Sequence, residues 1–154
     1  MNIAIVGATG NVGRKILEVL EFKKISIDQL YLVASPKSAG KKITFNGKEL
    51  EVQNLETFDF SNAEITFFSA GGKISEKYAA KAAEHSTVID NSSYFRMDPD
   101  VPLIVPEINS HDLKNYKKKN IIANANCSVI PLVVALKPLH DLYNIKRIVA
   151  STYQ

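Results

Sequence analysis

The chain has 154 residues, a length typical of one domain, and it can bury a core without disulfides or metals. Its 19 basic and 16 acidic residues give a formal charge of +3, too small to indicate nucleic acid binding. The N-terminus has neither a basic region nor a long apolar run, which argues against a signal peptide or membrane span. With a single cysteine besides, we expect a cytoplasmic protein that binds neither nucleic acid nor membrane.

Short β-branched runs alternate with segments of helical periodicity, the pattern of a parallel sheet covered by helices. Strands are expected at residues 3–6, 30–33, 64–68, 87–90, 120–123 and 145–149. Helices are expected after the first strand (with an apolar face of Val12, Ile16, Leu17 and Leu20), over 75–85 and from Cys127 to Leu142. Alternating apolar residues around Asn46-Gly47 predict a hairpin over 42–52. The expected class is α/β: a Rossmann-like, doubly wound, mostly parallel sheet with a small hairpin insertion.

A glycine-rich turn separates the first strand from the first helix, over Gly7–Gly13. Such glycines allow a tight turn and close backbone approach to a pyrophosphate, which the helix N-terminus stabilises. The position and spacing favour a dinucleotide site over a purely structural turn. The residues expected to bind the cofactor here are Gly7, Thr9, Gly10, Asn11, Val12 and Gly13.

The end of the second strand predicts which dinucleotide binds. NAD sites usually place an acidic residue there, against the ribose hydroxyls. Residues 34–41 read Ala-Ser-Pro-Lys-Ser-Ala-Gly-Lys, with no carboxylate, and Asp28 precedes the strand at its other end. We therefore expect Ser35, Lys37 and Ser38 to hold a 2′-phosphate, which predicts NADP, although a basic polar turn is the alternative.

The single cysteine, Cys127, lies between a predicted strand and a predicted helix. A lone cysteine is usually a small buried hydrophobe. However, Pro131 suits a first helical turn, and a helix N-terminus favours the thiolate. Asn124 and Asn126 offer donors for an oxyanion. Beside a nicotinamide, such a thiolate could form an acyl thioester that a hydride reduces, so Cys127 is the candidate nucleophile.

Arg96 lies in a polar loop, residues 91–98, after the strand at 87–90. A guanidinium there can bind a phosphate or carboxylate through two hydrogen bonds, but an ion pair with Asp98 is equally expected. The run Lys117–Lys119 is expected to be a solvated helix end. No metal site is expected, and three histidines are read as surface residues: His85, His111 and His140.

The chain stops directly after the apolar run at 145–149. A short edge strand at a genuine terminus would explain this, but a truncation explains it better. The expected organisation is a nucleotide-binding domain over residues 1–144, with Cys127 included, and the first strand of a largely missing catalytic and dimerisation domain over 145–154.

Several segments together resemble aspartate-semialdehyde dehydrogenase, over the whole chain but only the first half of that family's length. These segments are Gly7–Gly13, Ser38–Lys41, Ser69–Gly72, Asn91–Asp98, Val105–Asn109, Asn124–Ser128 and Ser151–Gln154. The resemblance implies reversible, NADP-dependent conversion of aspartyl β-phosphate to aspartate β-semialdehyde and phosphate. This reaction serves lysine, diaminopimelate, threonine and methionine biosynthesis.

Matched by position, the resemblance makes Cys127 the thioester nucleophile, beside Asn126. Arg96 and Asn91 become ligands of the substrate phosphate, and Gln154 positions the substrate. The partners are small molecules, and the full-length protein is expected to be a homodimer or homotetramer. Three further residues would lie along the cofactor: Ser69, Gly71 and Gly72.

Three alternatives stay open. Acetylglutamyl-phosphate reductase shares the fold and thioester chemistry, but Ser38–Lys41 and Ser151–Gln154 argue against it. A non-catalytic NADP-sensing module would also carry the glycine turn, and the tyrosine–lysine pair of active short-chain reductases is absent. The isolated chain could also bind cofactor without turnover, since the family's general-base histidine lies beyond Gln154.

Overall fold

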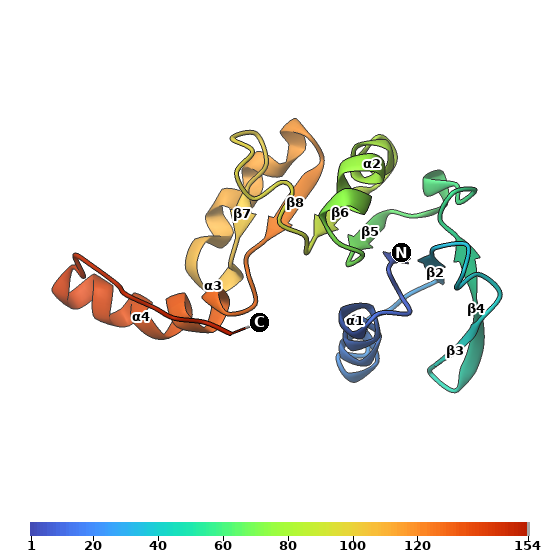
Figure 1. The fold of residues 1–154 in the computed structure, drawn as a ribbon, viewed down its shortest axis with the longest axis horizontal. Helices are drawn as coiled ribbons and strands as arrows, with labels where there is room; N and C mark the ends of the chain where they lie inside the picture. Colours follow the sequence, from blue (N-terminus) through green and yellow to red (C-terminus); the bar gives the residue numbers. More distant parts are fainter. Residues whose placement is uncertain (154) are drawn as a thin grey trace.

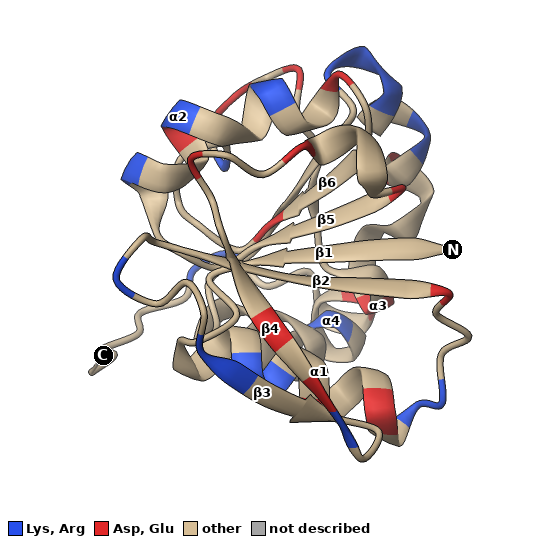
Figure 2. Cartoon of the chain, turned by 90° about the vertical axis from the view of Figure 1, so that its right-hand side faces the viewer, with Lys and Arg blue, Asp and Glu red and all other residues tan. Residues whose placement is uncertain are grey.

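A computed structural model describes residues 1–153 as one mostly parallel sheet with helices on both faces (Figures 1 and 2). The elements of the first half are β1 (Asn2–Val6), α1 (Asn11–Phe22), β2 (Gln29–Ala34), β3 (Lys42–Phe45), β4 (Lys48–Asn54), the 3-10 helix η1 (Phe60–Asn62) and β5 (Ile65–Phe68). Those of the second half are α2 (Gly72–Ala83), β6 (Thr87–Asp90), β7 (Leu103–Ile104), α3 (Pro106–Asn109), the 3-10 helix η2 (Ser110–Lys118), β8 (Ile121–Asn124) and α4 (Val129–Tyr143).

The strand order is β3-β4-β2-β1-β5-β6-β8-β7, and every pair except β3 with β4 is parallel. This confirms the predicted Rossmann-like class. The register aligns the carboxyl ends, because Val6 pairs with both Val33 and Phe68, Phe68 with Asp90, and Asp90 with Ala123. After β1 the chain adds β2 on one side of β1, and later adds β5 on the other side, so the strand order reverses at β1. Ligands of such sheets bind where the order reverses, at the carboxyl ends.

The predicted hairpin is confirmed and also extends the sheet. Asn46 and Gly47 have positive φ angles, 48° and 73°, as a tight two-residue turn requires. The second hairpin strand, β4, pairs in parallel with β2 through Leu32 and Val52. The hairpin therefore forms one edge of the main sheet.

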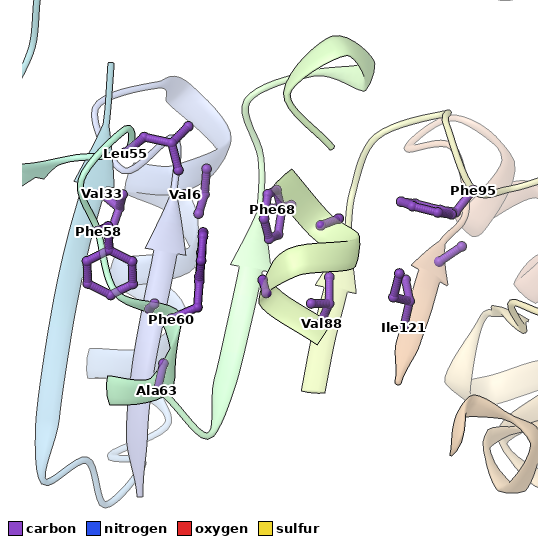
Figure 3. Packing of buried hydrophobic residues seen from close by; sticks show 14 of the residues in the cluster. Val6, Val33, Leu55, Phe58, Phe60, Ala63, Phe68, Val88, Phe95 and Ile121 are labelled. Carbon is purple, nitrogen blue, oxygen red and sulfur yellow. The ribbon is translucent and has the colours of Figure 1, made fainter. Parts of the chain in front are cut away.

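Buried apolar residues form a cluster on each face of the sheet. On the α2 side, the ring centroids of Phe58 and Phe60 are 5.2 Å apart in a T-shaped contact, and Phe60 stacks on Phe68 at 6.2 Å (Figure 3). On the α1 side, Leu17 and Leu20 pack against the sheet. Burial of one such side chain contributes about 1.5–3 kcal/mol. The two clusters hold the strands whose ends form the site.

Part of the α1 face of the sheet is less well covered. Val12 and Val19 of α1 are 52% and 46% exposed, and with Phe67 of β5 they line an apolar groove of about 400 Å³. The prediction of one buried face on α1 is thus right for Leu17 and Leu20 but wrong for Val12, because no described element packs over it. Within residues 1–153, apolar helix α4 likewise has no fully buried residue, and Figure 1 shows it projecting from the sheet.

The strand predicted at 145–149 is wrong. This segment is irregular and runs back along α4 (Figure 1). Ile145 and Ile148 line an apolar pocket there with Leu136. A strand needs a neighbouring strand to satisfy its backbone, and this segment lies beside a helix. The sequence patterns also missed β7, α3, η1 and η2, which are short or lack regular periodicity. No helix in the described part of the chain is long and apolar enough to span a membrane.

Candidate functional site

The glycine turn has the geometry that a dinucleotide site needs. Gly7 has a φ of +90° and donates its N–H to the Val33 carbonyl at 2.8 Å. A Cβ on Gly13 would lie 2.3 Å from the Gly7 carbonyl oxygen, so α1 packs against the turn only because residue 13 has no side chain. The N-terminus of α1 therefore packs directly against the glycine turn at the end of β1, the arrangement that binds anions in dinucleotide sites.

A pocket of about 300 Å³ lies at the carboxyl ends of β1, β2 and β5. Ser69 fixes one wall, because its Oγ donates to the Val6 carbonyl at 3.0 Å. The pocket brings together five of the predicted cofactor residues: Gly7, Thr9, Gly10, Ser35 and Ser69. The glycine cradle and the helix N-terminus fit a dinucleotide pyrophosphate at this place.

The other predicted cofactor residues lie around this pocket. Lys37 and Ser38 are in the turn after β2, where the Ser38 N–H donates to the Ser35 carbonyl at 2.8 Å, and Lys37 is exposed. The side chains of Asn11 and Val12 line the apolar groove on α1 instead.

The start of α2 lies beside the 91–98 loop. Gly71 has a φ of +89°, and a Cβ on Gly72 would lie 3.9 Å from Ser93 Oγ and from Tyr94 Cβ. Neither glycine lines the pocket among β1, β2 and β5. The two predicted cofactor glycines are therefore next to the predicted anion site.

Arg96 is held in a fixed orientation by two backbone carbonyls. Its Nε donates to the Asn124 oxygen at 3.0 Å and its Nη2 to the Asn91 oxygen at 3.1 Å. The side chains of Asn91 and Asn124 are also joined, since Asn124 Nδ2 donates to Asn91 Oδ1 at 2.6 Å. These bonds connect the 91–98 loop to the end of β8. The bond to Asn91 uses an amide donor of Asn124, which the sequence analysis expected to bind an oxyanion.

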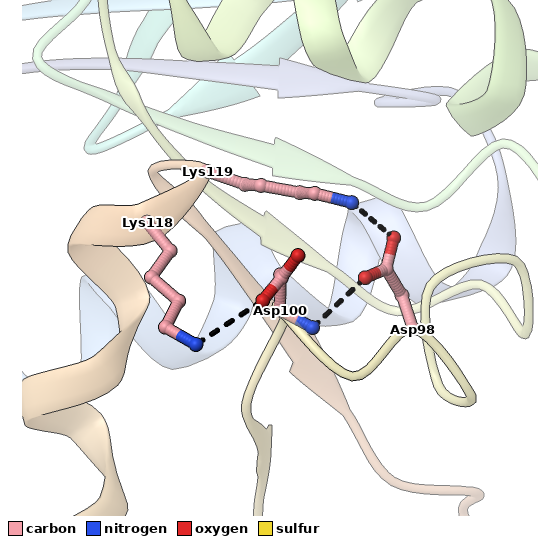
Figure 4. A network of polar contacts seen from close by, with 4 residues as sticks. All are labelled: Asp98, Asp100, Lys118 and Lys119. Atoms are coloured by element: carbon pink, nitrogen blue, oxygen red, sulfur yellow. Dashed lines mark hydrogen bonds and ion pairs between the residues drawn. The ribbon is translucent and has the colours of Figure 1, made fainter.

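The expected alternative, an ion pair of Arg96 with Asp98, is not found among the described residues. Asp98 accepts from Lys119 Nζ at 2.6 Å instead, and Lys118 pairs with Asp100 at 3.1 Å (Figure 4). The hydrogen bond from Lys119 lowers the pKa of Asp98, with help from the Asp100 N–H, and Asp98 raises the pKa of Lys119. Two lysines of the basic run thus brace the loop that carries Arg96.

Cys127 is exposed in the first turn leading into α4. The Asn126 carbonyl accepts from the N–H groups of Val129 and Ile130 at 3.0 and 3.1 Å, and its Oδ1 accepts from the Ser128 N–H at 2.9 Å. The helical turn therefore begins at Asn126, and the expected helix start beside the thiol is confirmed. The predicted substrate residue Gln154 lies outside the described residues.

Sequence patterns missed a buried polar network behind the loop. The Asp90 side chain is 0% exposed and binds Ser75 and Ser92. A charged residue closing the apolar run Thr87–Asp90 was the available signal. The three histidines, by contrast, are exposed as predicted: His85, His111 and His140.

Comparison with known proteins identifies the family of this chain. Residues 2–116 match the family described as "Semialdehyde dehydrogenase, NAD binding domain". An aspartate-semialdehyde dehydrogenase of Aquifex aeolicus is 56% identical over 154 residues, which cover 99% of this chain and 45% of the relative. The chain thus spans less than half the length of this curated relative.

Solved structures show the same likeness. Aspartate semialdehyde dehydrogenase II of Vibrio cholerae, complexed with ASA, has a TM-score of 0.89 and 52% identity over 91% of this chain and 46% of that one. The Candida albicans enzyme, solved with NADP, has a TM-score of 0.71 and 27% identity over 94% and 48%. From residue 2 to residue 116, the glycine turn and the sheet around it therefore belong to the NAD-binding domain of the semialdehyde dehydrogenase family.

Proposed function

We propose that this chain is the nucleotide-binding part of an NADP-dependent aspartate-semialdehyde dehydrogenase and supplies its thioester nucleophile, Cys127. The observation that carries the proposal is the hydrogen bond from Arg96 to the Asn124 carbonyl. This bond joins the guanidinium to the backbone three positions before the thiol. It lies at the carboxyl ends of the strands, where the glycine pocket also lies. The names of the relatives support the choice of substrate.

Arg96 and Asn91 are proposed to bind the phosphate of aspartyl β-phosphate. Two N–H groups of the guanidinium are bound by backbone carbonyls, which fixes its plane before any ligand arrives. A pre-oriented guanidinium loses little entropy when it binds a phosphate oxygen. The nearby N-terminus of α2 adds a positive dipole end on the same side of the loop.

Cys127 then attacks the acyl carbon. A C–S bond forms, the bond from the acyl carbon to the phosphate oxygen breaks, and phosphate leaves with the electron pair beside Arg96. NADPH, when bound, supplies the hydride that reduces the thioester. The C–S bond then breaks, and Cys127 regains its thiolate as the semialdehyde leaves. Asn126 holds the turn that presents the sulfur.

The proposed preference for NADP is supported by the turn after β2. Residues 34–41 carry two lysines and no carboxylate, so a 2′-phosphate meets positive charge without repulsion. Ser35, Lys37 and Ser38 are the proposed ligands, and the relative solved with NADP supports this choice. The remaining proposals are a cytoplasmic enzyme of lysine, diaminopimelate, threonine and methionine synthesis, and a homodimer or homotetramer for the whole protein. Residues 1–144 form its nucleotide-binding domain and 145–154 begin the next.

Acylation of the thiol tests the proposal directly. The chain is mixed with aspartyl phosphate, made in place by an aspartate kinase and ATP, and its intact mass is measured. We expect one aspartyl adduct that hydroxylamine removes, as it does from a thioester. Because the chain has one cysteine, Cys127→Ser is a complete control and stays unmodified. A wild-type chain that binds NADPH but takes up no aspartyl group contradicts the proposed chemistry.

A further inference from the structure

The carboxylate of Asp90 lies at the centre of a polar network inside the protein. Asp90 ends β6 and is 0% exposed, and Ser75 and Ser92 are 0% and 7% exposed. Asp90 Oδ1 accepts from Ser75 Oγ at 2.7 Å and from the Ser92 N–H at 2.9 Å. Its Oδ2 accepts from Ser92 Oγ at 2.7 Å. Three short bonds compensate the loss of water around this side chain.

The network joins three parts of the molecule that meet at the candidate site. Ser75 belongs to the first turn of α2, whose N-terminus favours a negative charge nearby. Ser92 is the second residue of the 91–98 loop, and its Oγ accepts from the Tyr94 N–H at 3.1 Å. Asp90 itself is fixed by its place in β6, between β5 and β8.

The residues that flank this network are the proposed phosphate ligands. Asn91 lies between Asp90 and Ser92 in the sequence, and its carbonyl accepts from Arg96 at 3.1 Å. The backbone of Asn91 is therefore held on both sides. Its N–H donates to the Phe68 carbonyl at 2.9 Å, and the next residue, Ser92, is bound to Asp90. A shift of this backbone would move the carbonyl that orients Arg96.

We propose that Asp90 is a positioning residue, which acts through Ser92 to hold Asn91 and Arg96 in the geometry that binds the acyl phosphate. This inference rests on the proposed function for its chemistry. The positioning itself concerns the loop and can be measured without any substrate. Asp90 is buried behind the loop, so its effect passes through Ser92 and Asn91.

A control exists on the same face of the sheet. Thr66 of β5 and Ser86 form another fully buried polar pair, with their hydroxyl oxygens 2.8 Å apart. Ser86 directly precedes the amino end of β6, whereas the 91–98 loop follows its carboxyl end. Thr66→Val removes a buried hydrogen bond of the same kind and lowers stability without touching the site.

Amide hydrogen exchange of the full chain measures the positioning. In Asp90→Asn and Ser92→Ala, we expect the amides of residues 91–98 to exchange about tenfold faster, because a charge-assisted buried bond is lost. Ser92→Thr keeps the hydroxyl and should restore slow exchange. Thr66→Val should leave this loop as in the wild type. Exchange that stays slow in Asp90→Asn, or that rises equally in Thr66→Val, overturns the inference.

Acylation of Cys127 measures the functional consequence. Asp90→Asn and Ser92→Ala should acylate about tenfold more slowly at low acyl phosphate concentration, with NADPH affinity unchanged, since neither residue lines the glycine pocket. A wild-type chain that is never acylated defeats the proposed function, while the exchange result still decides the positioning. Unchanged acylation in both variants, with a loosened loop, shows that the loop geometry does not serve the phosphate and overturns the catalytic part.

Discussion

The Nε of Arg96 donates to the carbonyl oxygen of Asn124 at 3.0 Å, although the two residues are 28 positions apart in the chain. Asn124 ends β8, so the bond ties the loop after β6 to the strand that leads to Cys127. An arginine at this place cannot move independently of the thiol segment. The proposed phosphate ligand and the proposed nucleophile are therefore one structural unit.

Arg96→Lys should slow acylation of Cys127 by about ten- to a hundredfold, because a lysine ammonium cannot hold two backbone carbonyls and bind a phosphate in a fixed plane. NADPH affinity should stay the same. Arg147→Lys is the control, since Arg147 is exposed in the segment after α4. Rates from quenched samples analysed by intact mass give the comparison. Equal rates for Arg96→Lys and wild type would falsify the role of Arg96.

Lys37→Glu should weaken NADPH binding about tenfold and leave NADH binding unchanged, because it places a negative charge beside the 2′-phosphate site. Lys48→Glu changes the charge equally on an exposed lysine of the hairpin. Fluorescence titration of each variant with both cofactors measures the preference. If Lys37→Glu and Lys48→Glu behave alike, the turn after β2 does not select the cofactor.

Cys127 should react with iodoacetamide at least as fast as a model thiol at neutral pH, because it is exposed in the turn that leads into α4. Bound NADP should slow the reaction by covering the sheet edge. The chain has a single cysteine, so every label reports this site. A thiol that reacts only after denaturation would return Cys127 to the class of buried hydrophobes.

Gly13→Ala should destabilise the fold by about 1–3 kcal/mol, since the new Cβ would lie 2.3 Å from the Gly7 carbonyl oxygen. It should also abolish NADPH binding by moving α1 away from the turn. Gly72→Ala is the matched change, because its Cβ has contacts no closer than 3.9 Å. Urea unfolding should show a loss for residue 13 and none for residue 72. Similar losses for both would show that the close approach is relieved elsewhere.

The Asp98–Lys119 ion pair should make stability depend on pH. The folded pKa of Asp98 is lowered, so its contribution is present above the unfolded value of about 3.9 and is lost as the pH falls through the folded value. The pKa of Lys119 is raised, so its contribution persists below about 10.4 and is lost as the pH rises through the folded value. Asp98→Asn should therefore lower the Tm at about pH 7 and leave it unchanged below about pH 2.

Circular dichroism melts of Asp98→Asn across this pH range check that expectation. Asp141→Asn removes an exposed i,i+4 ion pair with Lys137 in α4, far from the loop. That variant should change the Tm little at any pH, as exposed pairs do. A Tm difference for Asp98→Asn that is the same in acid and at neutrality would mean that the ion pair is not its cause.

Periodic patterns in the sequence predicted most of the sheet, because β1, β5 and β6 are short runs rich in apolar residues, a signal that each strand carries in its own sequence. They also located the glycine turn and the helix start at Cys127, where local backbone chemistry sets the structure. The bonds of Arg96 to Asn91 and Asn124 could not be read from the sequence. The bond to Asn124 depends on the pairing of β6 with β8, which brings separate segments together.

The error at 145–149 has a related cause. An apolar, β-branched run shows that a segment will be buried. Whether it forms a strand depends on whether it packs beside another strand or beside a helix. Here the neighbour is α4. The buried Asp90 was missed for the opposite reason, since its partners Ser75 and Ser92 come from a helix and a loop that composition alone does not place.

The apolar groove lined by Val12, Val19 and Phe67 is incompletely buried, so further burial there would stabilise the fold. Val12 and Val19 are about half exposed, so completing the burial of each would contribute about 1 kcal/mol. The groove and the glycine pocket share helix α1. Burial of the groove should therefore also hold the N-terminus of α1 more firmly against the glycine turn. Excluded uncharged solutes such as sucrose, which strengthen burial, should therefore tighten dinucleotide binding in step with thermal resistance.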